Sequence, residues 1–439
     1  MKEKFIKSTI ILIIGGIFTK IFSMFIRIIS TRIIGTEGIG LYMMILPSFN
    51  LFITIATLSF PLSISKLVAE EKRSSKSVVF SIVPLALLLN IIIIIFVILL
   101  APYIANTLLK NNQLYYPILA TAVTLPFITL SGILRGYFFG KQRMIPSVFS
   151  NIVEQVVRIL CILIIVPKTL KFGLSQAVTS LVITNIVSEF FSIIVLLLFL
   201  PKDIIIRKKD LVPSSKNIKN TLEISIPTTT GRVISSIALF LEPIIITYAF
   251  TKLGYTTGYI TKEYGIITGY VLPIVTLPSF LSSAISSALL PVITNKYQNN
   301  DMIFIKKRIR QAIVYSLIIG IPCTLIILLF PNIILKVMFG EVVGKNYLLF
   351  ASLIFLITYI NGPIISSLQA MDKSKNVLYA NIINAFIKIV CLLLFSILNI
   401  KMYSLLFAYL ISFVITTIYE FYELKKVLNK NWFKTFSFT

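Results

Sequence analysis

The sequence predicts an all-α polytopic membrane protein with about twelve transmembrane helices, arranged as two parallel-repeat six-helix lobes around a central cavity. Three observations lead to this fold class: the overall hydropathy, long apolar runs and an internal duplication. Mean hydropathy is +0.95, and 57% of the residues are hydrophobic while only 13% are charged. A soluble protein of this length would need a far more polar surface. Runs such as Leu85–Leu100 also exclude a membrane β-barrel, whose strands alternate between apolar and polar residues.

The apolar segments have the length that a bilayer requires. A membrane-spanning helix needs about 20 mostly apolar residues. Twelve segments meet this criterion, at residues 8–34, 41–65, 77–104, 113–137, 145–167, 175–200, 221–250, 264–293, 311–337, 347–370, 376–399 and 402–424. The first segment has no small-residue cleavage site and keeps Lys20 and Arg27 in its middle. We therefore predict that it is a retained transmembrane helix and not a signal peptide.

Two pairs of sequence stretches indicate that the chain is an internal duplication. Asn151–Leu163 resembles Asn381–Leu393, with an Asn, a basic residue and a Cys in the same register 230 positions apart. Leu46–Phe49 and Leu277–Phe280 both read Leu-Pro-Ser-Phe and lie 231 positions apart. Duplicated helix bundles are the way in which many transporters build a site near the middle of the membrane.

The longest polar connection, at 201–220, separates the sixth predicted span from the seventh. Because six spans precede this connection, the second half enters the membrane in the same orientation as the first, and the repeats are parallel. We predict an N-terminal six-helix lobe at 1–201, a cytoplasmic linker at 202–220, and a C-terminal six-helix lobe with an interfacial tail at 221–439.

The net charge of +25 is explained by membrane topology. With a cytoplasmic N-terminus, most Lys and Arg residues outside the spans fall on the connections that face the cytoplasm, as the positive-inside rule requires. This pattern predicts a multi-pass protein of the cytoplasmic membrane with both termini in the cytoplasm. Part of the charge then contacts anionic lipid headgroups, so membrane lipids are expected partners and nucleic acid is not.

The residue content argues against an enzyme and against a cofactor. The chain has no histidine, which excludes histidine acid–base chemistry and histidine metal ligands. Its three cysteines, Cys161, Cys323 and Cys391, lie within apolar spans. A phosphate-binding loop is absent from the sequence. We therefore expect no catalytic residues, no metal site, no cofactor and no ATPase activity.

Ionisable residues inside the predicted spans are the candidates for a functional site. A charge at the bilayer centre costs about 2.5–3.5 kcal/mol, so each one needs a partner or water. Glu154 and Arg158 are four residues apart and can pair on one helix face. The predicted structural or coupling residues are Glu154, Arg158 and Glu242. The predicted substrate-binding residues, for which structural pairing is the alternative, are Lys20, Arg27, Arg232 and Lys388.

The sign of these charges points to an anionic ligand. Lys20 and Arg27 are seven residues apart and share one helix face. Arg32 and Glu189 complete the set of ionisable residues at depth, in which basic residues outnumber acidic ones. A cavity of positive potential would attract phosphate or diphosphate, whose oxygens accept bidentate hydrogen bonds from guanidinium groups.

Four motifs resemble those of a known family. They are Gly35-Thr-Glu-Gly-Ile-Gly-Leu-Tyr42, Leu134-Arg-Gly-Tyr-Phe-Phe-Gly140, Glu154-Gln-Val-Val-Arg158 and Leu241-Glu-Pro-Ile244. The chain is similar through them to the stage V sporulation protein B group of polysaccharide-biosynthesis-type membrane proteins. This group belongs to the multidrug/oligosaccharidyl-lipid/polysaccharide (MOP) flippase superfamily, with the lipid II flippases and the multidrug and toxin extrusion (MATE) transporters.

The resemblance implies a V-shaped pair of six-helix lobes whose central cavity opens alternately to each side of the membrane. Lipid II flippases carry essential basic residues on their first helix, and Lys20 and Arg27 are the matching residues of this chain. Members of the group usually have fourteen spans, whereas twelve are predicted in this chain. The last residues, Asn429–Thr439, are predicted to lie at the membrane interface with Trp432 at the level of the headgroups.

The resulting hypothesis is a flippase for a polyprenyl-diphosphate-linked saccharide, a precursor of peptidoglycan or another polysaccharide, which crosses the cytoplasmic membrane by alternating access. No covalent bond is made or broken. A cation-coupled multidrug antiporter is the first alternative, favoured if Glu154, Glu189 or Glu242 couples transport to a cation. A non-transporting scaffold for cell-wall synthases is the second.

Overall fold

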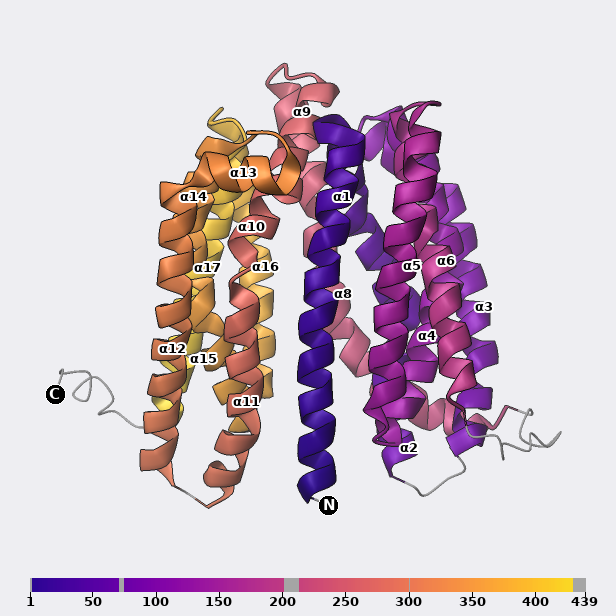
Figure 1. The fold of residues 1–439 in the computed structure, drawn as a ribbon, viewed down its shortest axis with the longest axis vertical. Helices are drawn as coiled ribbons and strands as arrows, with labels where there is room; N and C mark the ends of the chain where they lie inside the picture. The colour runs from indigo at the N-terminus through magenta and orange to yellow at the C-terminus, as the bar shows by residue number, and fades with distance from the viewer. Residues whose placement is uncertain (1, 71–74, 201–212, 300, 429–439) are drawn as a thin grey trace. The chain divides into compact units, whose positions relative to one another are not determined.

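The computed structural model describes residues 2–70, 75–200, 213–299 and 301–428, and every regular element among them is a helix (Figure 1). The predicted interfacial tail at Asn429–Thr439 lies outside the described residues. The contacts divide the chain into two compact units. Unit 1 comprises Met1–Thr251 and Tyr255–Gly265, and unit 2 comprises Lys252–Gly254 and Ile266–Thr439. The predicted linker at 202–220 falls largely on 201–212, also outside the described residues, so the lobe boundary stays a prediction.

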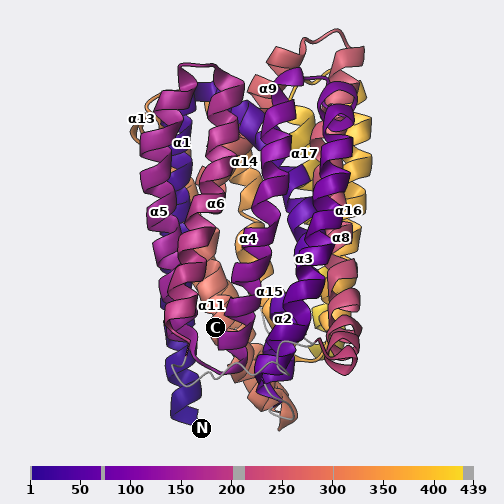
Figure 2. The ribbon, with the colours of Figure 1, turned by 90° about the vertical axis from the view of Figure 1, so that its right-hand side faces the viewer.

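Unit 1 is built from helices that are mostly long enough to cross a membrane. They are α1 (Lys2–Thr57), α2 (Phe60–Ala69), α3 (Ser75–Pro102), the π-helical turn η1 (Tyr103–Leu108), the 3₁₀ turn η2 (Asn112–Leu114), α4 (Tyr115–Gly140), α5 (Met144–Leu170), α6 (Leu174–Leu198), α8 (Ser215–Lys252) and α9 (Thr257–Gly265). In Figure 2 the helices α3 to α6 stand side by side. Phe60, Ile64, Ile82 and Phe138 form a buried core between α2, α3 and α4.

Unit 2 contains shorter and more broken helices. They are the π-helical turn η3 (Ile266–Val271), α10 (Leu272–Thr276), α11 (Ser279–Gln298), α12 (Met302–Leu329), α13 (Pro331–Phe339), α14 (Lys345–Phe355), α15 (Thr358–Ala370), α16 (Ser374–Ile397) and α17 (Tyr403–Leu428). The chain bends by 50° between α10 and α11, where the second Leu-Pro-Ser-Phe motif lies. A core around Ile309, Ile364, Leu368 and Leu424 joins α12, α15 and α17.

The number of spans agrees with the sequence once two broken elements are taken into account. Ten described helices are long and apolar enough to cross a membrane, or eleven if the bent pair counts as one span. The first of them contains two predicted spans, because at about 1.5 Å per residue its 56 residues would otherwise extend for roughly 84 Å. The non-helical backbone of Gly35, at φ 66° and ψ −173°, marks the break between them. All twelve predicted spans therefore fall on described helices.

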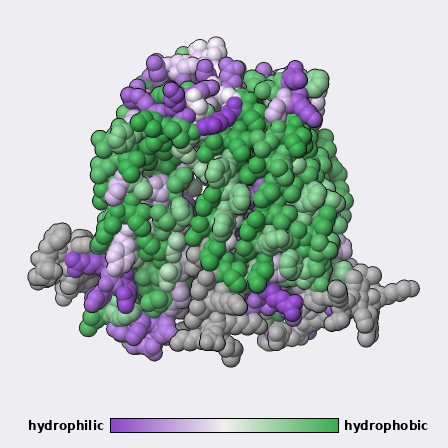
Figure 3. Space-filling model, in the orientation of Figure 1, coloured by the Kyte–Doolittle hydropathy of each residue, from purple (hydrophilic) through white to green (hydrophobic). Residues whose placement is uncertain are grey.

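The exposed side chains of the helices are of the hydrophobic kind that is expected in contact with lipid. Hydrophobic residues cover the sides of the helices in Figure 3, and hydrophilic residues gather at the helix ends. On α3, for example, Leu88, Ile91, Ile95 and Leu99 are each at least half exposed. In water such a surface would drive aggregation. In a bilayer it contacts acyl chains, so the chain is a multi-pass membrane protein.

Glycines allow α4 to approach α2 closely. Gly132, Gly136 and Gly140 repeat every four residues along one face of α4. A Cβ atom on Gly136 would lie 2.5 Å from the carbonyl oxygen of Pro61, at the start of α2. Because lipid is as apolar as the helix surfaces, close backbone packing of this kind is a main source of helix association in membranes.

We predict that Gly136→Ala lowers the stability of the protein by about 1–3 kcal/mol, because the added methyl group forces α2 and α4 apart. Gly16→Ala on α1 is the matched control, since nothing lies within 4 Å of the Cβ it would add. Thermal unfolding in detergent measures both variants. Equal melting temperatures would show that the α2–α4 contact does not limit stability.

Candidate functional site

Four ionisable side chains meet between α4, α5 and α6 of unit 1. Arg135 Nη2 lies 2.6 Å from Glu154 Oε2 and 3.6 Å from Glu189 Oε2. Arg158 Nη2 lies 2.7 Å from Glu154 Oε1, one helical turn along α5. Both glutamates are 5% exposed, so these ion pairs lie inside the helix bundle. Two guanidinium groups and two carboxylates balance one another in charge.

Hydroxyl groups of α6 add hydrogen bonds to this ion-pair network. Arg135 Nη2 donates to Ser192 Oγ at 2.8 Å. Arg158 donates to Ser188 Oγ from Nε at 3.3 Å and from Nη2 at 3.2 Å. Such hydrogen bonds lower the cost of burying the ion pairs. Two buried atoms, Arg135 Nε and Glu189 Oε2, have no hydrogen-bond partner among the described residues. The network therefore fixes three helices relative to one another and has no excess charge to offer an ionic ligand.

Arg27 lies close to this network but is held by α1 itself. Its half-buried side chain donates from Nη1 to Met43 Sδ at 2.8 Å, across the break at Gly35. The Tyr42 side chain lies near both Arg27 and Arg158. The two halves of α1 thus meet at Arg27. A thioether sulphur is only a weak acceptor, so it offers Arg27 little compared with a carboxylate or phosphate oxygen.

Lys20 lies two helical turns before Arg27 on the same face of α1, as the spacing predicts. Its side chain is exposed, and it forms no hydrogen bond or ion pair with any described residue. This part of α1 is open in general: Gly15, which packs on Val148 of α5, is its only buried residue between 14 and 29. The face of α1 that carries Lys20 and Arg27 is therefore basic and accessible.

Arg232 lies elsewhere in unit 1, on α8 beside the break between α1 and α2. Its exposed guanidinium group has Nη1 3.4 Å from Ser59 Oγ. Ser59 has a left-handed backbone, with φ 49°, and immediately precedes α2. Thr229 Oγ1 also donates to Ser59 Oγ, at 3.0 Å.

Two further hydroxyl pairs extend this contact into a seam along α8. Thr54 Oγ1 lies 3.0 Å from Ser236 Oγ, and Ser63 Oγ lies 2.8 Å from Ser225 Oγ. With the Ser59–Thr229 pair they form what we call the hydroxyl seam, which joins α8 to the end of α1 and to α2. Its residues are uncharged, so Arg232 is the basic group of this region.

Glu242 is a buried carboxyl group farther along α8. It is 3% exposed, and its Oε1 accepts a hydrogen bond from the Tyr264 hydroxyl of α9 at 3.0 Å. The four ionisable residues Glu154, Arg158, Glu189 and Glu242 lie on three predicted spans. Among the described ion pairs, the first three share one network with Arg135, and Glu242 has its hydrogen bond with Tyr264.

In unit 2, Lys388 is a buried basic residue on α16. It is 5% exposed, and its Nζ lies 5.3 Å from the ring centroid of Tyr409 on α17. One turn earlier, Asn384 Nδ2 donates to Thr416 Oγ1 at 3.2 Å. A lysine at this depth gains from the negative face of the aromatic ring.

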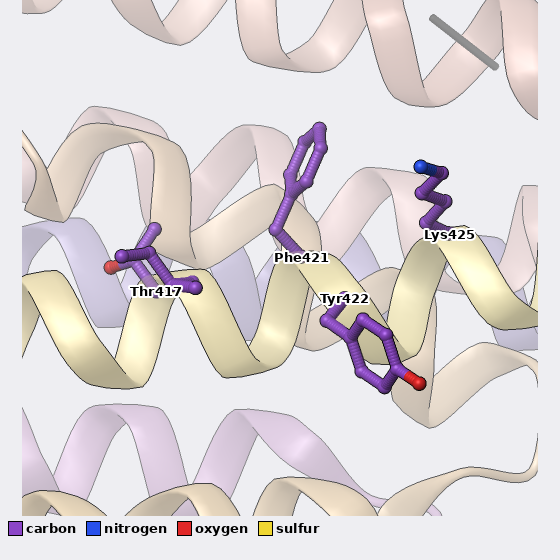
Figure 4. A pocket seen from close by; sticks show the side chains of 5 residues that line it. Thr417, Phe421, Tyr422 and Lys425 are labelled. Carbon is purple, nitrogen blue, oxygen red and sulfur yellow. The ribbon is translucent and has the colours of Figure 1, made fainter.

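A separate apolar groove of about 350 Å³ lies along α17. Its lining consists of Thr417, Ile418, Phe421, Tyr422 and Lys425. Figure 4 shows Phe421 and Lys425 on the same side of the helix, one turn apart. None of the residues that the sequence singled out for substrate binding lines this groove.

The structure brings together only part of the predicted set. Lys20 and Arg27 share a face of α1, and Glu154 and Arg158 belong to the ion-pair network. Arg232 and Glu242 each lie apart, and Lys388 belongs to unit 2. Arg135, which lies inside the predicted span 113–137, was not among the predicted site residues. Its position within the Arg-Gly-Tyr-Phe motif, upstream of Glu154, was the available signal.

Comparison with family models and curated proteins identifies relatives over most of the chain. A family model described as polysaccharide biosynthesis protein matches residues 5–297, and one described as MatE matches residues 238–394. Stage V sporulation protein B of Bacillus subtilis (strain 168) is 31% identical over 397 residues, 88% of this chain and 77% of that protein. The lipid II flippase MurJ of the same organism is 25% identical over 425 residues, 89% of this chain and 77% of that protein.

Solved structures show the same fold. The inward closed conformation of a lipid II flippase MurJ has a TM-score of 0.73 at 18% identity, covering 94% of this chain and 86% of that chain. The inward-facing conformation of a multidrug resistance MATE family transporter of the MOP superfamily has a TM-score of 0.71 at 16% identity, covering 96% of each chain.

These observations define an all-α multi-pass membrane protein with the fold of the lipid II flippase and MATE family structures. Within that class, the chain belongs to the polysaccharide biosynthesis protein family, which its family model and its identity to stage V sporulation protein B establish.

We predict that Arg135→Leu destabilises the protein by about 3–5 kcal/mol, because it leaves the buried Glu189 carboxylate without its guanidinium partner. Lys296→Leu is the control: it removes the exposed ion pair with Asp301, in which the side chains are 40% and 39% exposed. An exposed pair contributes at most about 1 kcal/mol. Thermal unfolding in detergent compares them, and equal losses would contradict a structural role for the network.

Proposed function

We propose that the protein translocates a polyprenyl-diphosphate-linked saccharide, a precursor of peptidoglycan or another polysaccharide, from the inner to the outer leaflet of the cytoplasmic membrane. The observation that carries this proposal is the balance of charge in unit 1. The carboxylates of Glu154 and Glu189 contact Arg135 and Arg158. On the basic face of α1, Lys20 is exposed and forms no ion pair with any described residue.

The chemistry of that face fits a diphosphate. A guanidinium group donates two parallel hydrogen bonds to phosphate oxygens, and the Lys20 ammonium adds a mobile positive charge two turns away. The Met43 sulphur that Arg27 contacts is readily replaced by a stronger acceptor. In this proposal the headgroup crosses by alternating access, the polyprenyl tail remains in lipid, and no covalent bond changes.

The other two predicted substrate-binding residues enter the proposal differently. Arg232 is exposed, so an anionic group can reach it directly. Lys388 is 5% exposed, so an anion reaches it only if α16 and α17 separate. Interaction with cell-wall synthases and the cytoplasmic placement of both termini stay predictions.

The relatives support a lipid-linked substrate. One is named lipid II flippase, and another, stage V sporulation protein B, bears the name of a stage of spore formation. We infer from these names a role in supplying a cell-wall or spore polysaccharide precursor.

We predict that Arg27→Ala abolishes translocation of a polyprenyl-diphosphate saccharide in reconstituted vesicles while melting temperature is nearly unchanged. Arg27→Lys also reduces the rate, because the planar pair of donors is lost. Binding of the same lipid to the unmodified protein weakens steeply with added salt. The control is Arg308→Ala, which removes an exposed arginine that contacts Gln311 on α12. Full activity of Arg27→Ala would refute the diphosphate-binding role.

Efflux of cationic drugs is the alternative, and the fold shared with a MATE family transporter is the observation that favours it. Such an antiporter needs a carboxyl group that binds and releases the coupling cation. Of the three predicted candidates, Glu154 and Glu189 lie in the ion-pair network, which leaves Glu242 with its Tyr264 hydrogen bond.

We predict that the reconstituted protein does not export an ethidium-like cation in response to a proton gradient, because the accessible face of α1 is basic and repels cations. Fluorescent export assays in vesicles measure this, with Glu242→Gln as the diagnostic variant. Proton-driven export that disappears in Glu242→Gln alone would replace the flippase proposal by the antiporter.

A further inference from the structure

Unit 2 contains a buried carboxyl group that the proposed translocation does not use. Glu420 lies on α17 and is 1% exposed. Its Oε2 atom has no hydrogen-bond partner in the described part of the chain. Neither an ion pair nor any other polar contact joins Glu420 to a described residue.

The internal duplication gives Glu420 a counterpart in unit 1. Glu189 precedes it by 231 positions, the same separation as the two Leu-Pro-Ser-Phe motifs. Both glutamates are followed by two aromatic residues. The buried stripe that leads to each of them also matches: Ala177, Leu181, Asn185 and Glu189 on α6 correspond to Ala408, Ser412, Thr416 and Glu420 on α17, and all eight are buried.

The ionic partners of Glu189 lie on α4 and α5, and the matching residues of unit 2 come 230 positions later in the chain. Two pairs of residues support this separation. Gln142 and Asp372, which end the turns after α4 and α15, both have positive φ, at 53° and 60°. Gly132 and Gly362 occupy the same position on those two helices. In this register, Arg135 corresponds to Ile365, Glu154 to Asn384 and Arg158 to Lys388.

Unit 2 has therefore kept the acid and lost the arginine that neutralises it. In unit 1, Arg135 Nη2 lies 3.6 Å from Glu189. In unit 2 the residue at that place is Ile365, which has no charge. The remaining basic counterpart, Lys388, lies over the ring of Tyr409 and makes no ion pair with Glu420.

The immediate surroundings of Glu420 are apolar. It lies between the levels of two contacts that join α16 to α17, Asn376–Glu423 and Asn384–Thr416. Between these levels the buried residues of α16 are Val377 and Ala380. No charged or titratable group on the packed helices contacts Glu420; those present are Lys345 and Tyr347 on α14, Tyr359 on α15, Lys375, Tyr379, Lys388 and Cys391 on α16, and Tyr403, Tyr409, Tyr419, Tyr422, Glu423, Lys425 and Lys426 on α17.

Such surroundings favour a proton over a metal cation. A lone carboxylate in an apolar membrane interior is costly, and adding a proton removes the charge. A hard metal cation would instead need about six oxygen ligands. Among the described residues, no group of three metal-ligating acidic or cysteine side chains occurs.

We propose that Glu420 is a proton-binding site of unit 2, and that its carboxylate takes up one proton from water and returns it during the transport cycle. The link to transport rests on the proposed function, whereas proton binding does not. In this arrangement the two halves of the duplication have divided their roles: the buried acids Glu154 and Glu189 of unit 1 are paired with arginines, and the counterpart acid Glu420 of unit 2 gains and loses a proton.

Infrared spectroscopy of the protein in lipid bilayers tests proton binding without any substrate. The carbonyl band of a protonated carboxylic acid is expected in the wild-type protein at mildly acidic pH, and it decreases as the pH rises. Glu420→Gln lacks this band. Glu423→Gln, three residues farther along α17, keeps it, because Glu423 is hydrogen-bonded to Asn376.

Three results would contradict the site. They are a spectrum of Glu420→Gln identical to that of the wild type at every pH, a Glu420 band that does not change with pH, and loss of the band on adding sodium at constant pH. The last result would assign a metal cation in place of the proton. A melting temperature close to that of the wild type shows that the variant is folded.

Vesicles with an imposed proton gradient then test the link to transport. The wild-type protein is expected to move a polyprenyl-diphosphate saccharide at a rate that changes with the gradient, and Glu420→Gln removes that dependence. A wild-type rate that ignores the gradient would refute coupling. No translocation at all would refute the proposed substrate, while the infrared result would still decide whether Glu420 binds a proton.

Discussion

The need to neutralise charge inside an apolar helix bundle governs the arrangement of unit 1. Glu154 accepts from arginines on two helices, Arg135 on α4 and Arg158 on its own helix α5, and Glu189 brings α6 to the same point. In lipid a charge without a partner is expensive, so these contacts restrict α4, α5 and α6 to one relative position. Helix α1 packs on this assembly, and its exposed Lys20 lies outside the ion-pair network.

Much of the fold was predictable because membrane insertion leaves a strong trace in sequence. All twelve apolar segments fall on described helices, and the family relationship follows from motifs such as the one ending at Arg158. The break at Gly35 falls between the predicted spans 8–34 and 41–65. The break before α2 was harder to place, because Leu58 and Ser59 adopt positive φ inside the second of these spans, where hydropathy gives no sign of it. Hydropathy measures affinity for lipid and carries little information about backbone angles.

Prediction of the site was less complete because partners depend on tertiary contact. The Glu154–Arg158 spacing within one helix allows the ion pair that the structure contains. Arg135 lies 19 positions before Glu154 and on another helix, so spacing along the sequence does not show that the two side chains meet. Glu420 was overlooked for a related reason, because it lies near the end of the last apolar segment. Only the packing of the helices shows that Arg135 is paired and that Glu420 is buried.

The position of Arg135 also has a consequence for synthesis of the protein. This residue lies five positions before the end of α4, whereas its acidic partners are on α5 and α6, which the ribosome makes later. When α4 first enters the membrane, the arginine is without them, and its long side chain can extend toward the headgroups from so near the helix end. Withdrawal of that side chain from the headgroups must then await the arrival of Glu154 and Glu189. The assembly of these three helices is thus ordered by the direction of translation.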